Sequence, residues 1–450
     1  MLTQWWPTLT RIEPGFGREL RRIPNQGARG FSLIEVLISM VLALITFLIM
    51  FQMFESWDKN KRSTASGGGA MISGAMAMFR LERDLRLAGF GFGSASEMGC
   101  DVRAYYSTRA PESSPGSISG LSSTAISDTD SNHKYRFPLV PFQIVSGPNG
   151  EVQLAVMYGS SEGVSAGQFF GTTAAGAQAY TGSTNSTITM DVGGRGGIHQ
   201  GDLVVATDGT NCYLTEVTNS SNSDRRTFEF TTSDYTSYYT NATTTPRYNL
   251  AGYVSLNATG NVYVLGPRPQ RRIWHIRNGR TLAFANDFWT DDVNNASGVA
   301  GSDGVNDVPF TEVADNIVGL QAQYAFMATV SGSTCTASAT PVWTATAPTN
   351  NCLWPFLWAI RVALLARSDQ FEKTWGVPGT SSAVAPRPSW NDGGLPFTMT
   401  DVGGTSAGTA DSFASATLTN PSKNPNDWRH YRYRVFEAVI PLKNVMWASR

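Results

Sequence analysis

Two stretches of the 450-residue chain match the G-x-S-x-G pattern that surrounds the nucleophilic serine of many hydrolases, at residues 159–163 and 404–408. In those enzymes the serine lies at a sharp turn between a strand and a helix of a parallel sheet. Neither stretch is followed by a helical pattern, and the chain is rich in Gly and Ser, so we expect neither serine to be catalytic. The histidines lie near no partner motif: His133, His199, His275 and His430. The sequence therefore predicts neither an enzyme nor a cofactor.

Acidic residues gather in two places where oxygen ligands could hold calcium. Residues 128–132 begin like an EF-hand loop, but His133 stands where that loop needs Gly and Leu139 where it needs Glu, so the match fails. A second group lies among Asn and Gly: Asp287, Asp291, Asp292, Asp303 and Asp307. These five aspartates are weak calcium candidates, and a solvated acidic loop is the alternative interpretation.

A basic and aromatic hairpin is the one candidate for binding a polyanion. It is predicted around Asn278-Gly279, a strong turn signal, and carries one tryptophan among its arginines: Arg268, Arg271, Arg272, Trp274, Arg277 and Arg280. Such a composition could bind DNA. The net charge of −1 provides no general attraction, and alternating arginines also occur on solvated strand faces. We therefore expect no nucleic-acid partner.

The four cysteines indicate two disulfides, because an even number in an exported protein is typical of disulfide pairing. The shorter loop would be closed by Cys335 and Cys352, which leaves Cys100 and Cys212 as the second pair by elimination. No CxxC or Cys/His cluster has the spacing of a zinc site, so we expect no metal there.

The most informative segment is apolar. Residues 31–54 contain a single charge, Glu35, and as a helix they would be about 36 Å long, enough to cross a bilayer of about 30 Å. Arginines dominate the charge of the preceding thirty residues, so the N-terminus is expected to be cytoplasmic and the rest exported. A cleaved secretory signal would have a shorter apolar core followed by a small-residue site. A plain membrane anchor leaves the buried acid unexplained.

The helix is expected to continue beyond the membrane, with a kink or a melting segment at Ser66-Gly67-Gly68-Gly69, because glycine weakens helices. Glu82 with Arg86, and Arg80 with Asp84, are predicted surface pairs. An apolar stripe is expected to pack against the protein's own sheet: Met71, Ala75, Met78, Leu81, Leu85 and Ala88.

After residue 90 the pattern becomes that of short strands separated by polar loops. Residues 94–133 and 368–428 are expected to be loops, the first one carrying Cys100. The predicted strands are Val152–Tyr158, Thr187–Val192, Asp202–Thr207, Tyr213–Val217, Arg271–Ile276, Arg280–Ala285, Ile317–Phe326, Leu357–Leu365 and Tyr433–Leu442. A helix followed by antiparallel strands predicts an α+β fold, with a long N-terminal hydrophobic helix packed on a large β-rich globular head.

The junction Arg29-Gly30-Phe31-Ser32-Leu33-Ile34-Glu35 resembles the cleavage motif of type IV prepilins. The resemblance implies that a prepilin peptidase cuts after Gly30 and that the new N-terminal residue, Phe31, is N-methylated. It also implies that Glu35 faces the amino terminus of a neighbouring subunit, where the acid would neutralise a cation in an apolar bundle. The expected domains are a leader at 1–30, the helix at 31–90 and an exported head at 91–450.

Further stretches resemble the minor pilin PilW family: 83–89, 201–205 with Cys212, 316–321 with Tyr324, and 433–444. This resemblance implies a structural subunit that helps to initiate type IV pilus assembly with other minor pilins and the major pilin. It would span the inner membrane once before it enters the extracellular fibre. Two alternatives stay open: a type II secretion pseudopilin, and a pilus-tip adhesin with Tyr235–Thr245 as its binding surface.

Overall fold

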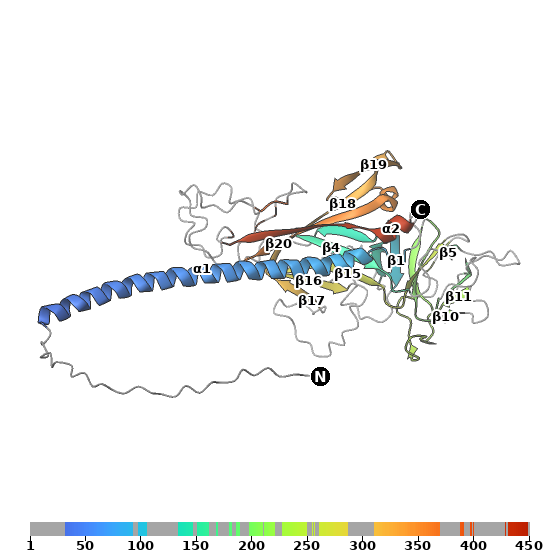
Figure 1. The fold of residues 1–450 in the computed structure, drawn as a ribbon. Coiled ribbons are helices and arrows are strands. Elements are labelled where there is room, and N and C mark those ends of the chain that lie inside the picture. Colours follow the sequence, from blue (N-terminus) through green and yellow to red (C-terminus); the bar gives the residue numbers. More distant parts are fainter. Residues whose placement is uncertain are drawn as a thin grey trace, which may run out of the picture. The chain divides into compact units, whose positions relative to one another are not determined.

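In the computed structural model, drawn as a ribbon in Figure 1, the chain divides into two units, Met1–Lys61 and Arg62–Arg450. The described residues are 32–92, 98–105, 134–146, 151–161, 168–169, 180–181, 186–189, 198–209, 211–220, 227–249, 254, 256, 261–286, 310–369, 388–390, 397, 399, 428 and 431–448. Gly30 and Phe31 lie outside them, as do the calcium candidates 287–307.

One long helix, α1 (Leu33–Leu87), runs without a break through 55 residues. Residues 66–69 are helical like their neighbours, so the expected kink is wrong for this state of the protein. A Cβ added to Gly67, Gly68 or Gly69 would meet no atom within 4 Å. The glycines therefore weaken the helix without being required by packing, and melting during assembly stays a prediction.

The last part of α1 packs against the strands of the second unit. The buried positions, which extend to Ala88 directly after the helix, follow helical spacing: Ala70, Gly74, Ala77, Met78, Leu81, Asp84, Leu85 and Ala88. The predicted stripe is confirmed from Met78 to Ala88 and wrong at its start, because Met71 and Ala75 are exposed. The helix face that meets the sheets is rotated toward Ala70 and Gly74, small residues that permit close approach of a strand.

A six-stranded sheet has the order β2 (Lys134–Pro138), β1 (Asp101–Tyr105), β9 (Cys212–Glu216), β8 (Leu203–Thr207), β14 (Asn261–Gly266) and β5 (Gln168–Phe169). Its pairs are antiparallel except β1 with β9, which run parallel with Val102 opposite Cys212. This parallel pair is an exception to the antiparallel arrangement expected of the head. Residues 101–105 were also expected to be a loop, and they form β1 instead.

A five-stranded antiparallel sheet has the order β17 (Thr311–Asp315), β16 (Thr281–Asn286), β15 (Gln270–Arg277), β4 (Val152–Tyr158) and β3 (Phe142–Ser146). The hairpin predicted at Asn278-Gly279 is confirmed. Both residues adopt positive φ, 51° and 65°, which is the conformation that Asn and Gly tolerate best in a tight turn.

A four-stranded antiparallel sheet has the order β19 (Thr334–Thr344), β18 (Ile317–Ser331), β20 (Leu357–Arg367) and β21 (Tyr433–Pro441). Leu320, Ala322, Tyr324 and Phe326 face the main core as predicted. Val318 does not, because a register shift between Ile317 and Gly319 turns it to the opposite face of the sheet.

Smaller elements complete the fold. A second four-stranded sheet has the order β10 (Asn219–Ser220), β11 (Thr227–Phe230), β7 (Ser186–Thr189) and β6 (Tyr180–Thr181), and a two-stranded ribbon joins β12 (Tyr235–Thr236) to β13 (Thr243–Thr244). The 3-10 helix η1 (Asn351–Phe356) precedes β20, and the short helix α2 (Lys443–Ala448) follows β21. The strands of the second unit form the β-rich head.

One buried cluster draws on α1 and on all three larger sheets, with Leu85, Leu214, Trp274 and Tyr324 as representatives. A second cluster covers the opposite face of the four-stranded sheet that contains β20: Ala363, Leu365, Trp390, Phe397, Met399 and Trp428. Its last four residues come from the stretch expected to be loops, so that stretch supplies core side chains. The fold is α+β with one long apolar helix and a strand-rich head, as predicted.

Candidate functional site

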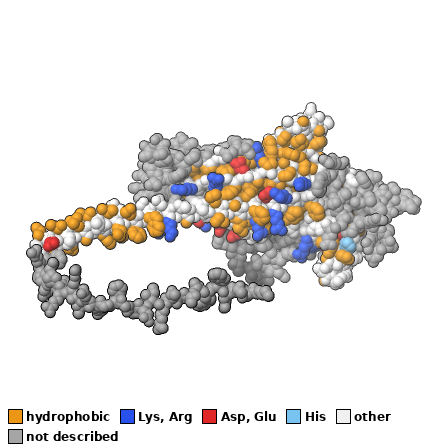
Figure 2. Space-filling view, in the orientation of Figure 1, with side chains coloured by type: hydrophobic (Ala, Val, Ile, Leu, Met, Phe, Trp, Pro, Cys, Tyr) orange, Lys and Arg blue, Asp and Glu red, His pale blue; other side chains and the backbone are white. Residues whose placement is uncertain are grey.

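The N-terminal part of α1 displays apolar side chains on every side. From Leu33 to Phe54 the large hydrophobic residues are between 48% and 80% exposed, and the apolar run is visible as the orange stretch of the helix in Figure 2. Its length and hydropathy suffice to cross a membrane. Among the described residues of this helix, Glu35 is the only acid before Glu55. Such a surface requires either lipid or other apolar helices around it.

Glu35 lies in the first turn of α1, where its amide donates a hydrogen bond to the carbonyl of Ser32 at 2.9 Å. An acid in the first turn interacts favourably with the helix dipole. The carboxylate is exposed and stands beside the predicted cleavage junction in sequence. It is therefore available to a cation that arrives from another molecule.

Farther along, in the second unit, the outer face of α1 carries a second set of exposed apolar residues, here called the outer stripe: Met71, Ile72, Ala75, Met76 and Phe79. Ile72 and Phe79 are 73% and 67% exposed. The stripe follows i, i+3 and i+4 spacing, so it forms one continuous face. A continuous apolar face on a helix is typical of a contact with another helix.

The opposite face of α1 is fixed to the head through Asp84. Its carboxylate accepts hydrogen bonds from Arg272 Nη1 at 2.9 Å and from Trp274 Nε1 at 3.2 Å, both from β15. Burial raises the pKa of Asp84, while the charge and hydrogen bonds of Arg272 act in the opposite direction. The prediction that Asp84 lies on the helix surface in a pair with Arg80 is therefore wrong, because Asp84 is buried. The predicted Glu82–Arg86 pair is confirmed.

Arg272 is held in an aromatic environment. Its guanidinium lies 4.6 Å from the ring centre of Phe284 and 5.8 Å from that of Tyr158. Burial, with a further contribution from Asp84, raises the pKa of Tyr158 to about 12. Cation–π contacts with two rings and a pairing with a carboxylate stabilise a charge that is mostly removed from water.

Close packing fixes the same helix face to β21. A Cβ built on Gly74 would overlap the ring of Phe436, whereas the helix glycines 67–69 have open space around them. Farther toward the end of α1, the side-chain amide Nδ2 of Asn444 lies within 3.4 Å of the carbonyls of Arg86, Leu87 and Ala88 at the end of the helix. Helix α1 is therefore in direct contact with residues of β21 and α2 that lie more than 350 residues later in the sequence.

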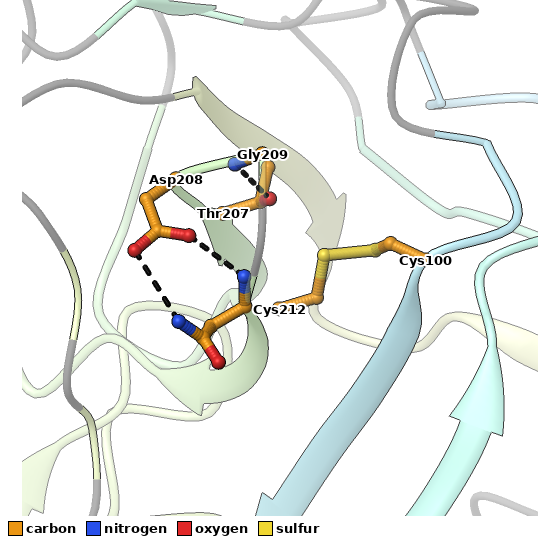
Figure 3. The surroundings of a disulfide bond; sticks show 6 residues. Cys100, Thr207, Asp208, Gly209 and Cys212 are labelled. Atoms are coloured by element: carbon orange, nitrogen blue, oxygen red, sulfur yellow. Dashed lines mark hydrogen bonds between the residues drawn. A yellow bond between two sulfur atoms is a disulfide. The ribbon is translucent and has the colours of Figure 1, made fainter.

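The Cys100–Cys212 disulfide joins the residue before β1 to the first residue of β9 (Figure 3). The neighbouring turn is ordered by Asp208, whose carboxylate accepts the amide of Asn211 at 2.7 Å, and by the hydroxyl of Thr207, which accepts the amide of Gly209 at 3.0 Å. The bridge thus holds the parallel β1–β9 pair at the end where the two strands begin.

The Cys335–Cys352 disulfide joins β19 to η1. Across the hairpin, Cys335 is opposite Val330 of β18. Asn350 accepts the amide of Cys352 at 3.0 Å and begins η1. Both disulfides are the pairs expected from the sequence, and together they involve all four cysteines.

The basic hairpin does not expose all of its arginines on one open face. Arg271 is 2% exposed and Arg272 binds Asp84, while Arg277 donates to Glu312 at 3.3 Å and lies over the ring of Phe310. These three arginines contribute to packing within the head, and this reduces the case for a polyanion site.

The stretch Tyr235–Thr245 contains both buried and exposed tyrosines. Tyr235 is buried and donates to Glu216 Oε1 at 2.6 Å, and Tyr239 donates to Asp202 Oδ1 at 2.6 Å. Tyr238 is 59% exposed. The sequence offered no signal for the two acids, because they lie 19 and 37 residues before the tyrosines they bind and match no motif.

Comparison with known families adds two matches. The model of the type IV pilus-assembly protein W family, PilW, matches residues 304–444, and the model of the prokaryotic N-terminal methylation motif matches residues 25–51. Neither a curated protein nor a solved structure matches the chain. The PilW match spans the sheet that contains β18 and β20, and the methylation motif contains Gly30, Phe31 and Glu35. Residues 304–444 are thus similar to PilW and residues 25–51 to the N-terminal methylation motif, and the one long apolar helix among the described residues and the strand-rich head agree with a PilW-like, type IV prepilin-like protein.

Proposed function

We propose that this chain is a minor pilin that helps to initiate assembly of a type IV pilus, in a tip or priming complex with other minor pilins and the major pilin. The observation that carries the proposal is the surface of α1: a span of exposed apolar side chains with one acid in its first turn. The role is structural and non-catalytic.

Processing prepares the helix for this role. A prepilin peptidase removes residues 1–30, and the new amino terminus at Phe31 is methylated. The N-terminal ammonium of one subunit would be costly in an apolar bundle unless an acid of a neighbour lies close to it. Glu35, exposed and four residues from Phe31, supplies that acid and fixes the register of adjacent helices.

Before assembly, the span around residues 33–54 lies once across the inner membrane with its N-terminus in the cytoplasm, because arginines precede it. The head is exported. On assembly the apolar surface exchanges lipid for neighbouring helices, and the outer stripe, from Met71 to Phe79, extends this contact within the second unit.

Glu35→Gln tests the proposal, with Glu55→Gln on the same helix as the matched control. In a strain that lacks the native gene, we expect the Glu35 variant to reach the membrane at normal abundance and to restore less than a tenth of the sheared pili, whereas the Glu55 variant restores them fully. Equal piliation by both variants would contradict the role of Glu35. A strain without the gene that assembles normal pili but fails to secrete exoproteins would favour the pseudopilin alternative.

A further inference from the structure

Three aromatic rings from two segments of the chain meet on the surface of the head. The imidazole of His199 stacks on Tyr238 with ring centres 4.0 Å apart and an angle of 22°, and Tyr239 meets Tyr238 edge-on at 5.3 Å and 90°. These residues are here called the ring cluster. Tyr238 is 59% exposed and Tyr239 37%, so the cluster presents a large aromatic surface to solvent rather than contributing to the core.

The ring cluster rests on a buried acid. Asp202, which is 1% exposed, accepts the hydroxyl of Tyr239 through Oδ1 at 2.6 Å and the amide of His199 through Oδ2 at 2.8 Å. One carboxylate therefore positions two of the three rings. The amide of Tyr238 donates to the carbonyl of Gln200 at 3.1 Å, which fixes the third ring to the same segment.

A second buried acid supports the base of the loop between β12 and β13. Glu216, which is 2% exposed, accepts the hydroxyl of Tyr235 at 2.6 Å, and its second oxygen accepts the amide of Arg247 at 2.7 Å. The side chain of Asn249 pairs with both the amide and the carbonyl of Glu216. A satisfied buried network of this kind specifies one loop conformation.

The tip of the loop is a tight turn rather than a long flexible segment. Asn241 adopts φ of 52°, and its amide donates to the carbonyl of Ser237 at 2.9 Å, while the amide of Ser237 donates to the carbonyl of Ala242 at 2.9 Å. The rings are thus held in place before any ligand arrives, which lowers the entropic cost of binding.

The chemistry of the surrounding surface narrows the class of ligand. The exposed neighbours of Tyr238 in the turn are small or polar: Thr240, Asn241, Ala242 and Thr243. An apolar protein partner would be matched by a wider apolar surface around the rings. The carboxylate of Asp202 is occupied by internal hydrogen bonds with Tyr239 and His199, so this acid does not select an ion. Aromatic faces beside hydroxyl and amide groups match a molecule with an apolar C–H face and a polar rim.

A sugar ring is such a molecule, and we propose that the ring cluster is a carbohydrate-binding site. The C–H face of a pyranose stacks on Tyr238, and the sugar hydroxyls bond to the polar side chains of the turn. The site lies at His199 and in the turn between β12 and β13, which is outside the segment 304–444 matched by the PilW model. Binding at this site is independent of pilus assembly, so either can fail without the other.

The test uses the full chain in lipid nanodiscs and saturation-transfer NMR with four oligosaccharides of equal length: cellohexaose, chitohexaose, maltohexaose and mannohexaose. We expect at least one to receive magnetisation from the protein and to compete with its own longer polymer. Tyr238→Leu, which keeps an apolar side chain and removes the aromatic face, should weaken this binding about tenfold, whereas Tyr238→Trp should retain it.

Two controls make the result specific. Trp358→Ala removes a 41% exposed aromatic residue on β20, away from the ring cluster in sequence, and should leave binding unchanged. Tyr239→Phe keeps the ring and removes its bond to Asp202, and should weaken binding less than Tyr238→Leu. Absence of transfer to all four oligosaccharides would overturn the proposal. So would equal binding by Tyr238→Leu and the wild type, which would indicate a general apolar contact.

Discussion

The carboxylate of Asp84 accepts both of its hydrogen bonds with Arg272 from one nitrogen, Nη1, at 2.9 and 3.0 Å, although the residues are 188 positions apart. The pair joins α1 to the central strand of the five-stranded sheet. The pair therefore fixes the last part of α1 to the strand-rich head within the second unit.

Replacement of Asp84 by an apolar residue should destabilise the second unit. Asp84→Leu leaves Arg272 and the indole Nε1 of Trp274 without their partner, so we expect the free energy of unfolding to fall by about 3 kcal/mol. Urea unfolding of the detergent-solubilised chain, followed by tryptophan fluorescence, measures it. Glu82→Gln, which removes a solvent-exposed pair on the same helix, should cost at most about 0.5 kcal/mol. Similar losses of unfolding free energy in Asp84→Leu and Glu82→Gln would show that the buried Asp84–Arg272 pair stabilises the protein no more than an exposed pair does.

The contact between Gly74 and Phe436 should tolerate no side chain on the helix. Gly74→Val places atoms where the phenyl ring lies, and we expect a loss of about 1–3 kcal/mol of stability. Gly68→Ala is the matched control, because its Cβ meets open space and should stabilise the helix by up to about 1 kcal/mol. Addition of Phe436→Ala to Gly74→Val should recover part of the loss; no recovery would exclude this contact as the cause.

The two disulfides should differ in their contribution to stability. In the loop-entropy description the longer loop stabilises more: about 4.7 kcal/mol for a loop on the order of 100 residues and about 3 kcal/mol for one of about 15. We therefore expect Cys100→Ser with Cys212→Ser to lower the unfolding midpoint more than Cys335→Ser with Cys352→Ser. Non-reducing peptide mapping checks the pairing itself, and a crossed pair would refute it.

Acid should destabilise the head through His275. Its side chain is 5% exposed, and burial lowers its pKa from 6.5 to about 4, with the charge of Arg277 adding to the effect. A depressed folded-state pKa contributes stability that is complete above about pH 6.5 and is lost as the pH falls toward 4, by about 3 kcal/mol. Unfolding free energies between these pH values should show this slope in the wild type and a flatter one in His275→Phe. The same slope in both would assign the acid sensitivity to other groups.

Local patterns were sufficient for much of the fold. The strand Val152–Tyr158 has the predicted bounds, and the Asn278-Gly279 turn determines its own hairpin because few other residues accept positive φ. The apolar span is equally local. The parallel pairing of β1 with β9 could not be predicted in this way, because it depends on a contact between residues more than 100 positions apart.

Polar side chains proved hardest to place from the sequence. Asp84 has the spacing of a surface ion pair, yet it faces inward because Arg272 and Trp274 lie opposite it. The burial of Glu216 and Asp202 was not predicted for the same reason, because their tyrosine partners lie at no fixed spacing from them in the sequence. Met71 is exposed because the helix face that contains Gly74, and not the face that contains Met71, packs against Phe436.

The most direct test of the pilin account is the mass of the N-terminal peptide of the chain expressed with and without the prepilin peptidase. The account predicts a mature chain that begins at N-methylated Phe31 only when the peptidase is present, and no processing of a Gly30→Asp variant. An intact N-terminus in both strains would contradict it and leave Glu35 without a role.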